Sequence, residues 1–155
     1  MAERKSIDPR GPRFGAGITA VLLLVVIALS LSGAWLAAFI VFAVITLGFA
    51  WGAFAGIQRH PYGLLFKKLV RPRLAPPAEL EDATPPTFAQ GVGFFITLVG
   101  VVLFLVGLQL ALPIAAALAF IAAFLNSVFA YCLGCQIYLL LVRAKVLGRG
   151  TPSAA

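Results

Sequence analysis

Residues 14–58 decide the fold class: they read FGAGITAVLLLVVIALSLSGAWLAAFIVFAVITLGFAWGAFAGIQ and contain no charged side chain. A helix that crosses the hydrocarbon core of a bilayer needs about 20 apolar residues, so this stretch is long enough for two such helices. The segment Ser30-Leu31-Ser32-Gly33 lies near its middle and is rich in turn-forming residues. The stretch therefore predicts a hairpin of two membrane-spanning helices, Gly15 to Leu31 and Ala34 to Ile57.

A second uncharged stretch covers residues 83–142. It is interrupted at Gln109-Leu110-Ala111-Leu112-Pro113, where Pro113 suits the first turn of a new helix. We expect helices from Gln90 to Leu110 and from Pro113 to Arg143. Strands are excluded because an open sheet cannot pair its backbone groups in lipid. The expected fold is all-α, an integral membrane four-helix bundle built from two helical hairpins.

The composition supports this interpretation, with 62% hydrophobic and 11% charged residues and a mean hydropathy of +1.05. Soluble domains have roughly 45–50% apolar and about 25% charged residues. The net charge of +7 does not indicate nucleic-acid binding, because the cations flank apolar runs and form no patch interleaved with aromatic residues. The expected partners are membrane lipids.

The cations also predict an orientation, since all of them fall on one side of a four-span arrangement. Positive residues mark the cytoplasmic side, so both termini and the middle loop are expected inside a bacterial cytoplasmic (inner) membrane. The expected organisation is a tail at 1–14, a hairpin at 15–57, a loop at 58–89, a hairpin at 90–143 and a tail at 144–155. The twelve cations are Arg4, Lys5, Arg10, Arg13, Arg59, Lys67, Lys68, Arg71, Arg73, Arg143, Lys145 and Arg149.

The middle loop has two parts. The first is predicted to be a short amphipathic helix in the headgroup layer, because apolar residues recur at helical spacing between cations: Tyr62, Leu65, Phe66 and Leu69. The second is proline-rich and is expected to contain no long helix up to residue 89: Pro72, Pro76, Pro77, Pro85 and Pro86. It also carries the acidic cluster Glu79, Glu81 and Asp82. It is either a solvated connector or a docking strip for a cytoplasmic protein.

The predicted spans contain no ionisable side chain apart from the cysteine thiols and tyrosine hydroxyls, which argues against proton-coupled transport. The single histidine, His60, cannot supply the two axial ligands of a bis-histidine haem, and the sequence identifies no cofactor. Glycines at regular spacing mark packing faces, either within the bundle or at a seam between two copies. They are Gly48, Gly52 and Gly56 in the second predicted helix, and Gly93, Gly100 and Gly107 in the third.

The only cysteines form a C-x-x-C motif, Cys132-Leu133-Gly134-Cys135. Such spacing serves dithiol redox chemistry or provides half of a soft-metal site. Three interpretations stay open. The cysteines carry out thiol redox or sulfur relay, they are inert packing residues of a structural or assembly subunit, or they handle a soft metal ion. Whether the chain is an enzyme also stays open.

A continuous last helix would place Cys135 about 12 Å and Cys132 about 16 Å from its cytoplasmic end at Arg143. Cys135, the shallower thiol, is then expected to attack and Cys132 to resolve. A regular helix holds such side chains too far apart for a disulfide, so Gly134 is expected to let the helix loosen, and Gly134→Ala is expected to leave the fold almost unchanged. An apolar site also disfavours the thiolate, so a water-filled cavity is required, lined by Ser127, Tyr131, Gln136 or Tyr138.

Three segments resemble an uncharacterised actinobacterial family of small membrane proteins, a domain of unknown function. They are Arg59-His60-Pro61-Tyr62-Gly63, the loop from Pro72-Arg73-Leu74 to Phe88-Ala89-Gln90-Gly91, and Cys132-x-Gly134-Cys135-x-x-Tyr138. The resemblance covers roughly Arg13 to Arg143. It implies a four-span membrane protein that keeps company with cytoplasmic thioredoxin-like or rhodanese-like sulfurtransferase proteins. It assigns no activity to any residue.

Overall fold

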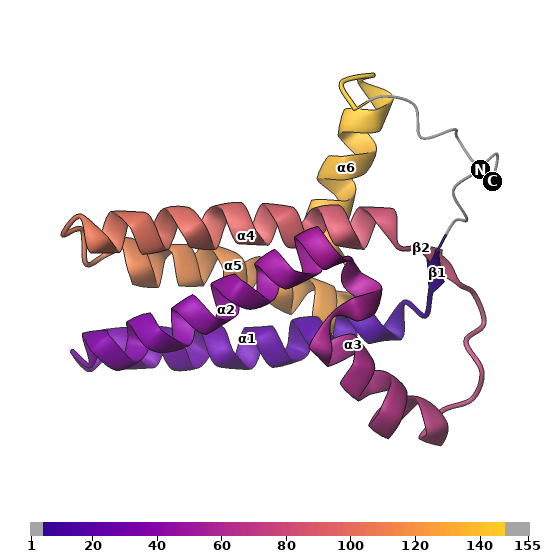
Figure 1. Cartoon of the computed structure of the whole chain (residues 1–155), viewed down its shortest axis with the longest axis horizontal. Helices are drawn as coiled ribbons and strands as arrows, with labels where there is room; N and C mark the ends of the chain where they lie inside the picture. The colour runs from indigo at the N-terminus through magenta and orange to yellow at the C-terminus, as the bar shows by residue number, and fades with distance from the viewer. Residues whose placement is uncertain (1–4, 148–155) are drawn as a thin grey trace.

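Four long helices lie side by side in the computed structural model, which describes residues 5–147 (Figure 1). They are α1 (Arg10–Leu31), α2 (Trp35–Ala55), α4 (Thr84–Leu105) and α5 (Ala111–Phe129). Each has 19 to 22 residues and is apolar enough to cross a membrane. The predicted helical architecture of two hairpins is confirmed.

Both hairpins close through tight turns that contain glycine, although the second turn begins after Leu105 and so lies earlier than the predicted break at Gln109 to Pro113. Gly33, between α1 and α2, has a φ of 82°, and Gly107, between α4 and α5, has a φ of 102°. Residues with a Cβ rarely adopt this left-handed conformation, so the two turns explain why glycine stands at these positions.

The helices pack in the order α1, α2, α4, α5, with α5 returning against α1. Glycines allow their close approach, because a Cβ on Gly52 would lie 2.7 Å from the Gln90 side chain and one on Gly100 would lie 2.5 Å from the Ala115 Cβ. A Cβ on Gly93 would meet the Phe49 ring at 2.5 Å. These three predicted packing glycines therefore make contacts within the bundle. The buried core lies in the half of the bundle away from α3, and includes Leu23, Val26, Ala38, Phe42 and Leu112.

Two helices begin earlier than predicted. The first begins at Arg10 rather than Gly15, and the third begins at Thr84 rather than Gln90. Pro85 and Pro86 do not break the third helix because its first turn has no intrahelical acceptors for their missing N–H groups. The Asp82 carboxylate accepts hydrogen bonds from the backbone N–H and the hydroxyl of Thr84, both at 2.8 Å.

The predicted last helix, Pro113 to Arg143, is wrong as a single element. It begins at Ala111 and ends at Phe129, and a separate helix, α6 (Leu133–Arg143), leads away from the bundle (Figure 1). Ala130 adopts the left-handed conformation, with φ 57° and ψ 24°, and at this residue the chain leaves the direction of α5, so that α6 stands across the bundle (Figure 1). At about 1.5 Å per residue, the 19 residues of α5 span about 28 Å, close to the roughly 30 Å of a bilayer core.

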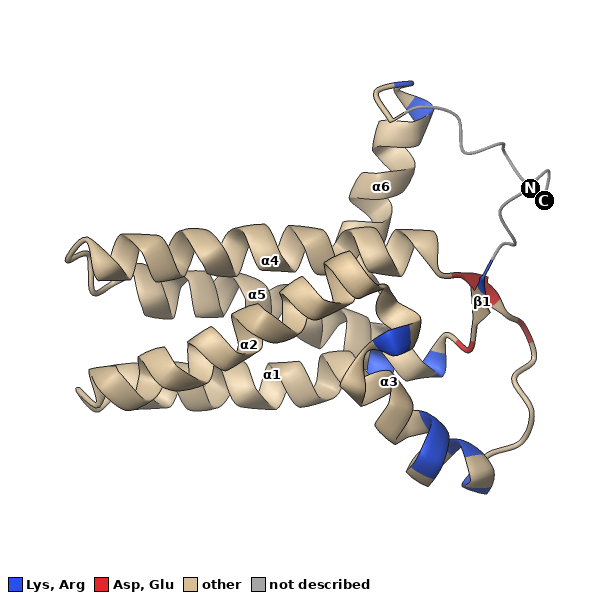
Figure 2. Cartoon of the chain, in the orientation of Figure 1, with Lys and Arg blue, Asp and Glu red and all other residues tan. Residues whose placement is uncertain are grey.

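The charged residues of the described chain gather at one end of the bundle and on the far end of α6, whereas the turns at the opposite end carry none (Figure 2). We call the former the charged end. The predicted loop helix is present as α3 (Pro61–Leu65), the π-helical segment η2 (Phe66–Val70) and the 3-10 segment η3 (Arg71–Arg73), preceded by η1 (Ile57–Arg59). Arg4 and Arg149, and the outer parts of both predicted tails, lie outside the described residues.

The amino-terminal segment is fastened to the middle loop at the charged end. Strand β1 (Ser6–Ile7) pairs antiparallel with β2 (Glu81–Asp82), with Ser6 opposite Asp82. The Arg10 guanidinium binds the Asp8 carboxylate at 2.8 Å and also donates to the Ala75 carbonyl at 3.1 Å. The hydrogen bond from Arg10 lowers the pKa of Asp8 below its ordinary value. These contacts hold residues 5–8 beside the mouth of the site described next.

Candidate functional site

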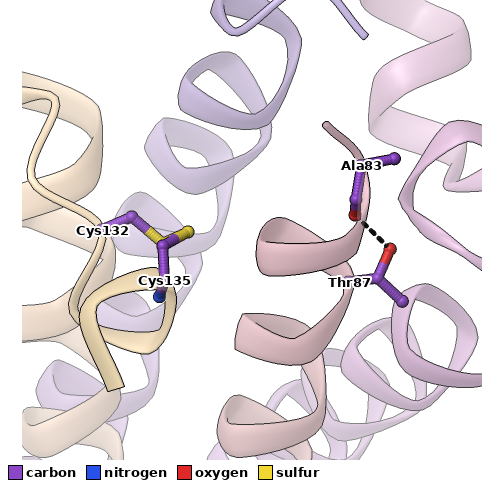
Figure 3. Close-up of a disulfide and its surroundings, with 4 residues drawn as sticks. All are labelled: Ala83, Thr87, Cys132 and Cys135. Carbon is purple, nitrogen blue, oxygen red and sulfur yellow. Dashed lines mark hydrogen bonds between the residues drawn. A yellow bond between two sulfur atoms is a disulfide. The ribbon is translucent and has the colours of Figure 1, made fainter. Parts of the chain in front are cut away.

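Cys132 and Cys135 form a disulfide at the beginning of α6, with their Cα atoms 5.2 Å apart (Figure 3). Cys132 precedes the first helical residue and has an extended backbone, with φ −87° and ψ 102°. The expected loosening of a continuous helix around Gly134 is therefore not needed, because Cys132 lies outside the helix and its side chain reaches back over the first turn. The expected depth of about 12 to 16 Å assumed one continuous last helix, and this premise does not hold because the motif lies between the end of α5 and the first turn of α6.

The local sequence explains this geometry. The backbone N–H groups of Ala130 and Tyr131 both donate to the Leu125 carbonyl, the latter at 3.1 Å, and so close the end of α5. Cys132 then caps α6, because its Sγ accepts a hydrogen bond from the backbone N–H of Cys135 at 3.2 Å. The Cys132 sulfur thus lies at the positive end of the α6 dipole.

Gly134 has a different role from the one expected. A Cβ on this residue would lie 2.5 Å from the Ala89 Cβ and 2.6 Å from the Ala89 Cα. Because the second of these atoms belongs to the backbone, alanine at position 134 cannot fit unless α6 moves away from α4. The expectation that Gly134→Ala leaves the fold almost unchanged is therefore contradicted.

The disulfide lines a cavity of about 710 Å³ between α1, α3, α4, α5 and the beginning of α6. Of the four polar residues expected to line it, Gln136 does, whereas Ser127, Tyr131 and Tyr138 are not among its lining residues. Tyr138 instead packs against Phe88, with ring centroids 5.4 Å apart. The lining polar groups Tyr62, Gln90 and Asn126 come from three different helices, so no local sequence signal could identify them as a group.

Figure 3 shows the disulfide facing the side on which the first turn of α4 lies, where the Thr87 hydroxyl donates to the Ala83 carbonyl at 2.8 Å. Both cysteines are half-buried. Glu81 and Asp82, from the acidic cluster of the middle loop, line the same cavity. The sulfur atoms are therefore reachable from the charged end and are not sealed in the core.

His60 fixes the loop helix to α2. Its Nδ1 accepts a hydrogen bond from the backbone N–H of Tyr62 at 3.2 Å, so Nε2 carries the proton and donates to the Gly48 carbonyl at 3.0 Å. The side chain is buried, and this burial lowers the pKa of His60 below its usual 6.5. His60 is thus a neutral structural histidine that positions α3 and the cavity wall.

This arrangement predicts that acid weakens the bundle through His60. Because its folded-state pKa is lowered, the stabilisation is complete above about pH 6.5 and is lost as the pH falls through the lowered value. The thermal unfolding midpoint in one detergent should fall between pH 7.5 and pH 5.5 for the wild type and fall less for His60→Gln. Equal decreases in the two proteins would show that other groups carry the effect. Asp8 does not interfere, since its lowered pKa lies below this window.

Among residues 5–147, no three His, Cys, Asp or Glu side chains come together in a group that could hold a metal ion. The site as described is one cysteine pair beside a cavity.

A family model described as a domain of unknown function (DUF4395) matches residues 7–143. No curated protein and no solved structure matches the chain.

Proposed function

The chain belongs to the DUF4395 family, and we propose that it is a multi-pass membrane protein that exchanges disulfides with a cytoplasmic thioredoxin-like protein through Cys132 and Cys135. The observation that carries this proposal is the position of Cys132 as the cap of α6, where its Sγ accepts the Cys135 N–H at 3.2 Å. A backbone donor and the helix dipole stabilise a thiolate, which is the nucleophilic form of cysteine.

The geometry reverses the roles expected from depth alone. Cys132, as the capping residue, is the attacking thiol, and Cys135, within the first turn of α6, is the resolving one. This order follows from the hydrogen bond that a Cys132 thiolate keeps in the reduced protein. Cys135 has no corresponding side-chain hydrogen bond among the described residues.

The exchange proceeds in two balanced steps. The Cys132 thiolate attacks one sulfur of the partner disulfide, so a Cys132–partner S–S bond forms, the partner S–S bond breaks, and the departing partner thiolate takes up a proton. Cys135 loses its proton and attacks the Cys132 sulfur, which closes the Cys132–Cys135 bond and releases the second partner thiol. Two electrons pass from the chain to the partner, and the reverse sequence reduces the chain.

The surroundings support access by a partner from the charged end. The disulfide and the acidic residues Glu81 and Asp82 line one cavity, so a protein that docks on the middle loop reaches the sulfur atoms. The positive-inside pattern favours the cytoplasmic side for this end.

The interpretation as inert packing cysteines is disfavoured because both side chains are half-buried and line the cavity. The observed S–S pairing favours disulfide exchange over sulfur relay.

The test is a covalent trap with a defined partner. Purified thioredoxin without its resolving cysteine is converted to a mixed disulfide with thionitrobenzoate and is added to the reduced full chain carrying Cys135→Ser. The Cys132 thiolate should displace the coloured leaving group and form a stable adduct with thioredoxin. The expected rate is on the order of tenfold above that of Cys132→Ser, because only Cys132 caps α6.

The matched control is the same pair of variants unfolded in denaturant, where the two thiols should react at similar rates. The proposal fails if both folded variants react more slowly than their unfolded forms, since the cysteines would then be protected packing residues.

A further inference from the structure

The cavity beside the disulfide is large enough to hold a small molecule. Its volume of about 710 Å³ lies within the roughly 300–1,000 Å³ that is typical of ligand sites. Most of the buried core lies toward the opposite end of the bundle, and only its α5 members Ala119 and Ala123 also line the cavity. Close packing is the rule in protein interiors, so a space of this size next to the cysteine pair is a candidate ligand site.

The lining separates polar from apolar groups along the bundle axis. Charged residues line the cavity only at its mouth, where both signs occur: Asp8, Arg13, Lys67, Arg71, Glu81 and Asp82. The rest of the lining is mostly small or apolar, and its uncharged polar side chains include those of Tyr62, Gln90, Asn126 and Gln136. The amides of Gln90 and Asn126 make no hydrogen bond among the described residues, and both are partly exposed. An amide N–H₂ offers two donors, so these groups suit a neutral ligand with acceptor oxygens.

Two apolar residues of α5 that line the cavity are exposed. Leu118 and Ile121 line it and are 55% and 52% exposed. Leu118 lies eleven residues before the end of α5, which is about 16 Å along the helix and roughly halfway across a bilayer core. A ligand that dissolves in lipid can therefore enter from the side.

The proposed exchange itself requires a second redox partner. When a soluble dithiol has reduced the Cys132–Cys135 bond, the disulfide is restored only if two electrons leave the chain. The sequence contains no further cysteine, so the acceptor is a separate molecule that contacts the sulfur atoms.

We propose that this cavity binds a lipid-soluble quinone, whose carbonyl oxygens accept hydrogen bonds from Gln90 and Asn126 and which reoxidises Cys132 and Cys135. This inference rests on the proposed function, because the quinone reoxidises the cysteine pair after a soluble dithiol protein has reduced it. In the step, the two S–H bonds break and one S–S bond forms. The two electrons and two protons convert the two quinone carbonyls to hydroxyls, which gives the hydroquinone.

The test uses 2,3-dimethyl-1,4-naphthoquinone, because its fully substituted quinone ring does not form a simple thiol adduct. Binding is measured by equilibrium dialysis with the purified full chain carrying Cys132→Ser and Cys135→Ser, which cannot reduce the probe. One molecule should bind per chain, saturably. Ala122→Phe, which fills the cavity from α5, should weaken binding at least tenfold. The matched control is Val128→Phe, a substitution on the same helix at a 59% exposed position outside the cavity, and it should leave binding unchanged.

Gln90→Leu provides a second variant of similar size that removes an amide donor, and it should weaken binding severalfold. In the redox arm, reduced wild-type chain and the quinone are mixed without oxygen. One hydroquinone and one disulfide should form per chain, at a rate that saturates with quinone concentration. Ala122→Phe should slow this reaction at least tenfold and Val128→Phe should not.

Failure of the two proposals can be told apart. If thioredoxin exchange occurs but the quinone does not bind saturably, or if Ala122→Phe and Val128→Phe behave alike, the cavity assignment is overturned and the exchange function stands. If the quinone binds but the thiols react with neither thioredoxin nor quinone, the exchange function and the electron-transfer step fail. Displacement of the quinone by an equal concentration of a phospholipid would overturn the assignment in favour of a lipid.

Discussion

Gly134→Ala is expected to move α6 away from α4 and to reduce the fraction of closed Cys132–Cys135 disulfide. The added Cβ would lie 2.5 Å from the Ala89 Cβ and 2.6 Å from its Cα, distances that nonbonded carbon atoms do not tolerate. Overpacking of this kind costs about 1–3 kcal/mol. Moving α6 relieves this overlap, and because α6 begins at the Cys132 cap and lines the cavity, the movement changes the surroundings of both cysteines.

The measurement is the oxidised fraction of the pair in a series of glutathione redox buffers. In Gly134→Ala, the equilibrium constant for closing the Cys132–Cys135 disulfide should fall on the order of tenfold, since about 1.4 kcal/mol corresponds to a factor of ten. Gly91→Ala is the matched control, because it lies on α4 two residues from Ala89 and its Cβ would meet only the Ala53 Cβ at 4.0 Å. Combining Gly134→Ala with Ala89→Gly should restore closure only in part, since the overlap with the backbone of residue 89 remains. Unchanged closure in Gly134→Ala would show that α6 is not held against α4.

The charge-free stretches predicted the bundle well because lipid imposes one simple requirement, a run of apolar residues of sufficient length. The first turn was visible at Gly33, whereas Gly107 was expected to be a packing residue inside the third helix and instead lies in the turn with a positive φ. The early start of α4 was missed because Pro85 and Pro86 usually indicate a helix break. In the first turn they are tolerated, and Asp82, whose carboxylate accepts the Thr84 N–H just before the helix, lies in a segment that was expected to be a loop.

The break between α5 and α6 was missed for the opposite reason. Phe129-Ala130-Tyr131 contains no glycine or proline, and alanine favours helix, yet Ala130 adopts the left-handed conformation. The sequence feature that could have indicated the start of a new helix is Cys132 followed two residues later by Gly134, a glycine that permits close approach to Ala89. The cysteine pair could be identified from sequence spacing, whereas the cavity beside it could not, because residues from several helices meet only in the folded chain.

Because the helix breaks at Ala130, we expect the thiols to react with reagents from one side of the membrane only. In the reduced Cys135→Ser variant, a maleimide that cannot cross membranes should label Cys132 in inside-out vesicles and not in right-side-out vesicles, because the motif follows the end of α5 and positive residues face the cytoplasm. In reduced single-cysteine variants, Cys132 should react on the order of tenfold faster than Cys135, since the cap position stabilises the thiolate.

Ser32→Cys in a chain lacking both native cysteines supplies the matched control, because Ser32 is exposed in the turn at the opposite end of the bundle. It should be labelled only in right-side-out vesicles. Labelling of Cys132 and Ser32→Cys from the same side would contradict the four-span arrangement. If Cys132 were labelled only in right-side-out vesicles and Ser32→Cys only in inside-out vesicles, the arrangement would stand with the opposite orientation. If Cys132 resists the impermeant reagent on both sides but reacts with a permeant one, the sulfur lies at membrane depth, and the break at Ala130 does not bring it to the surface where a cytoplasmic thiol protein can reach it.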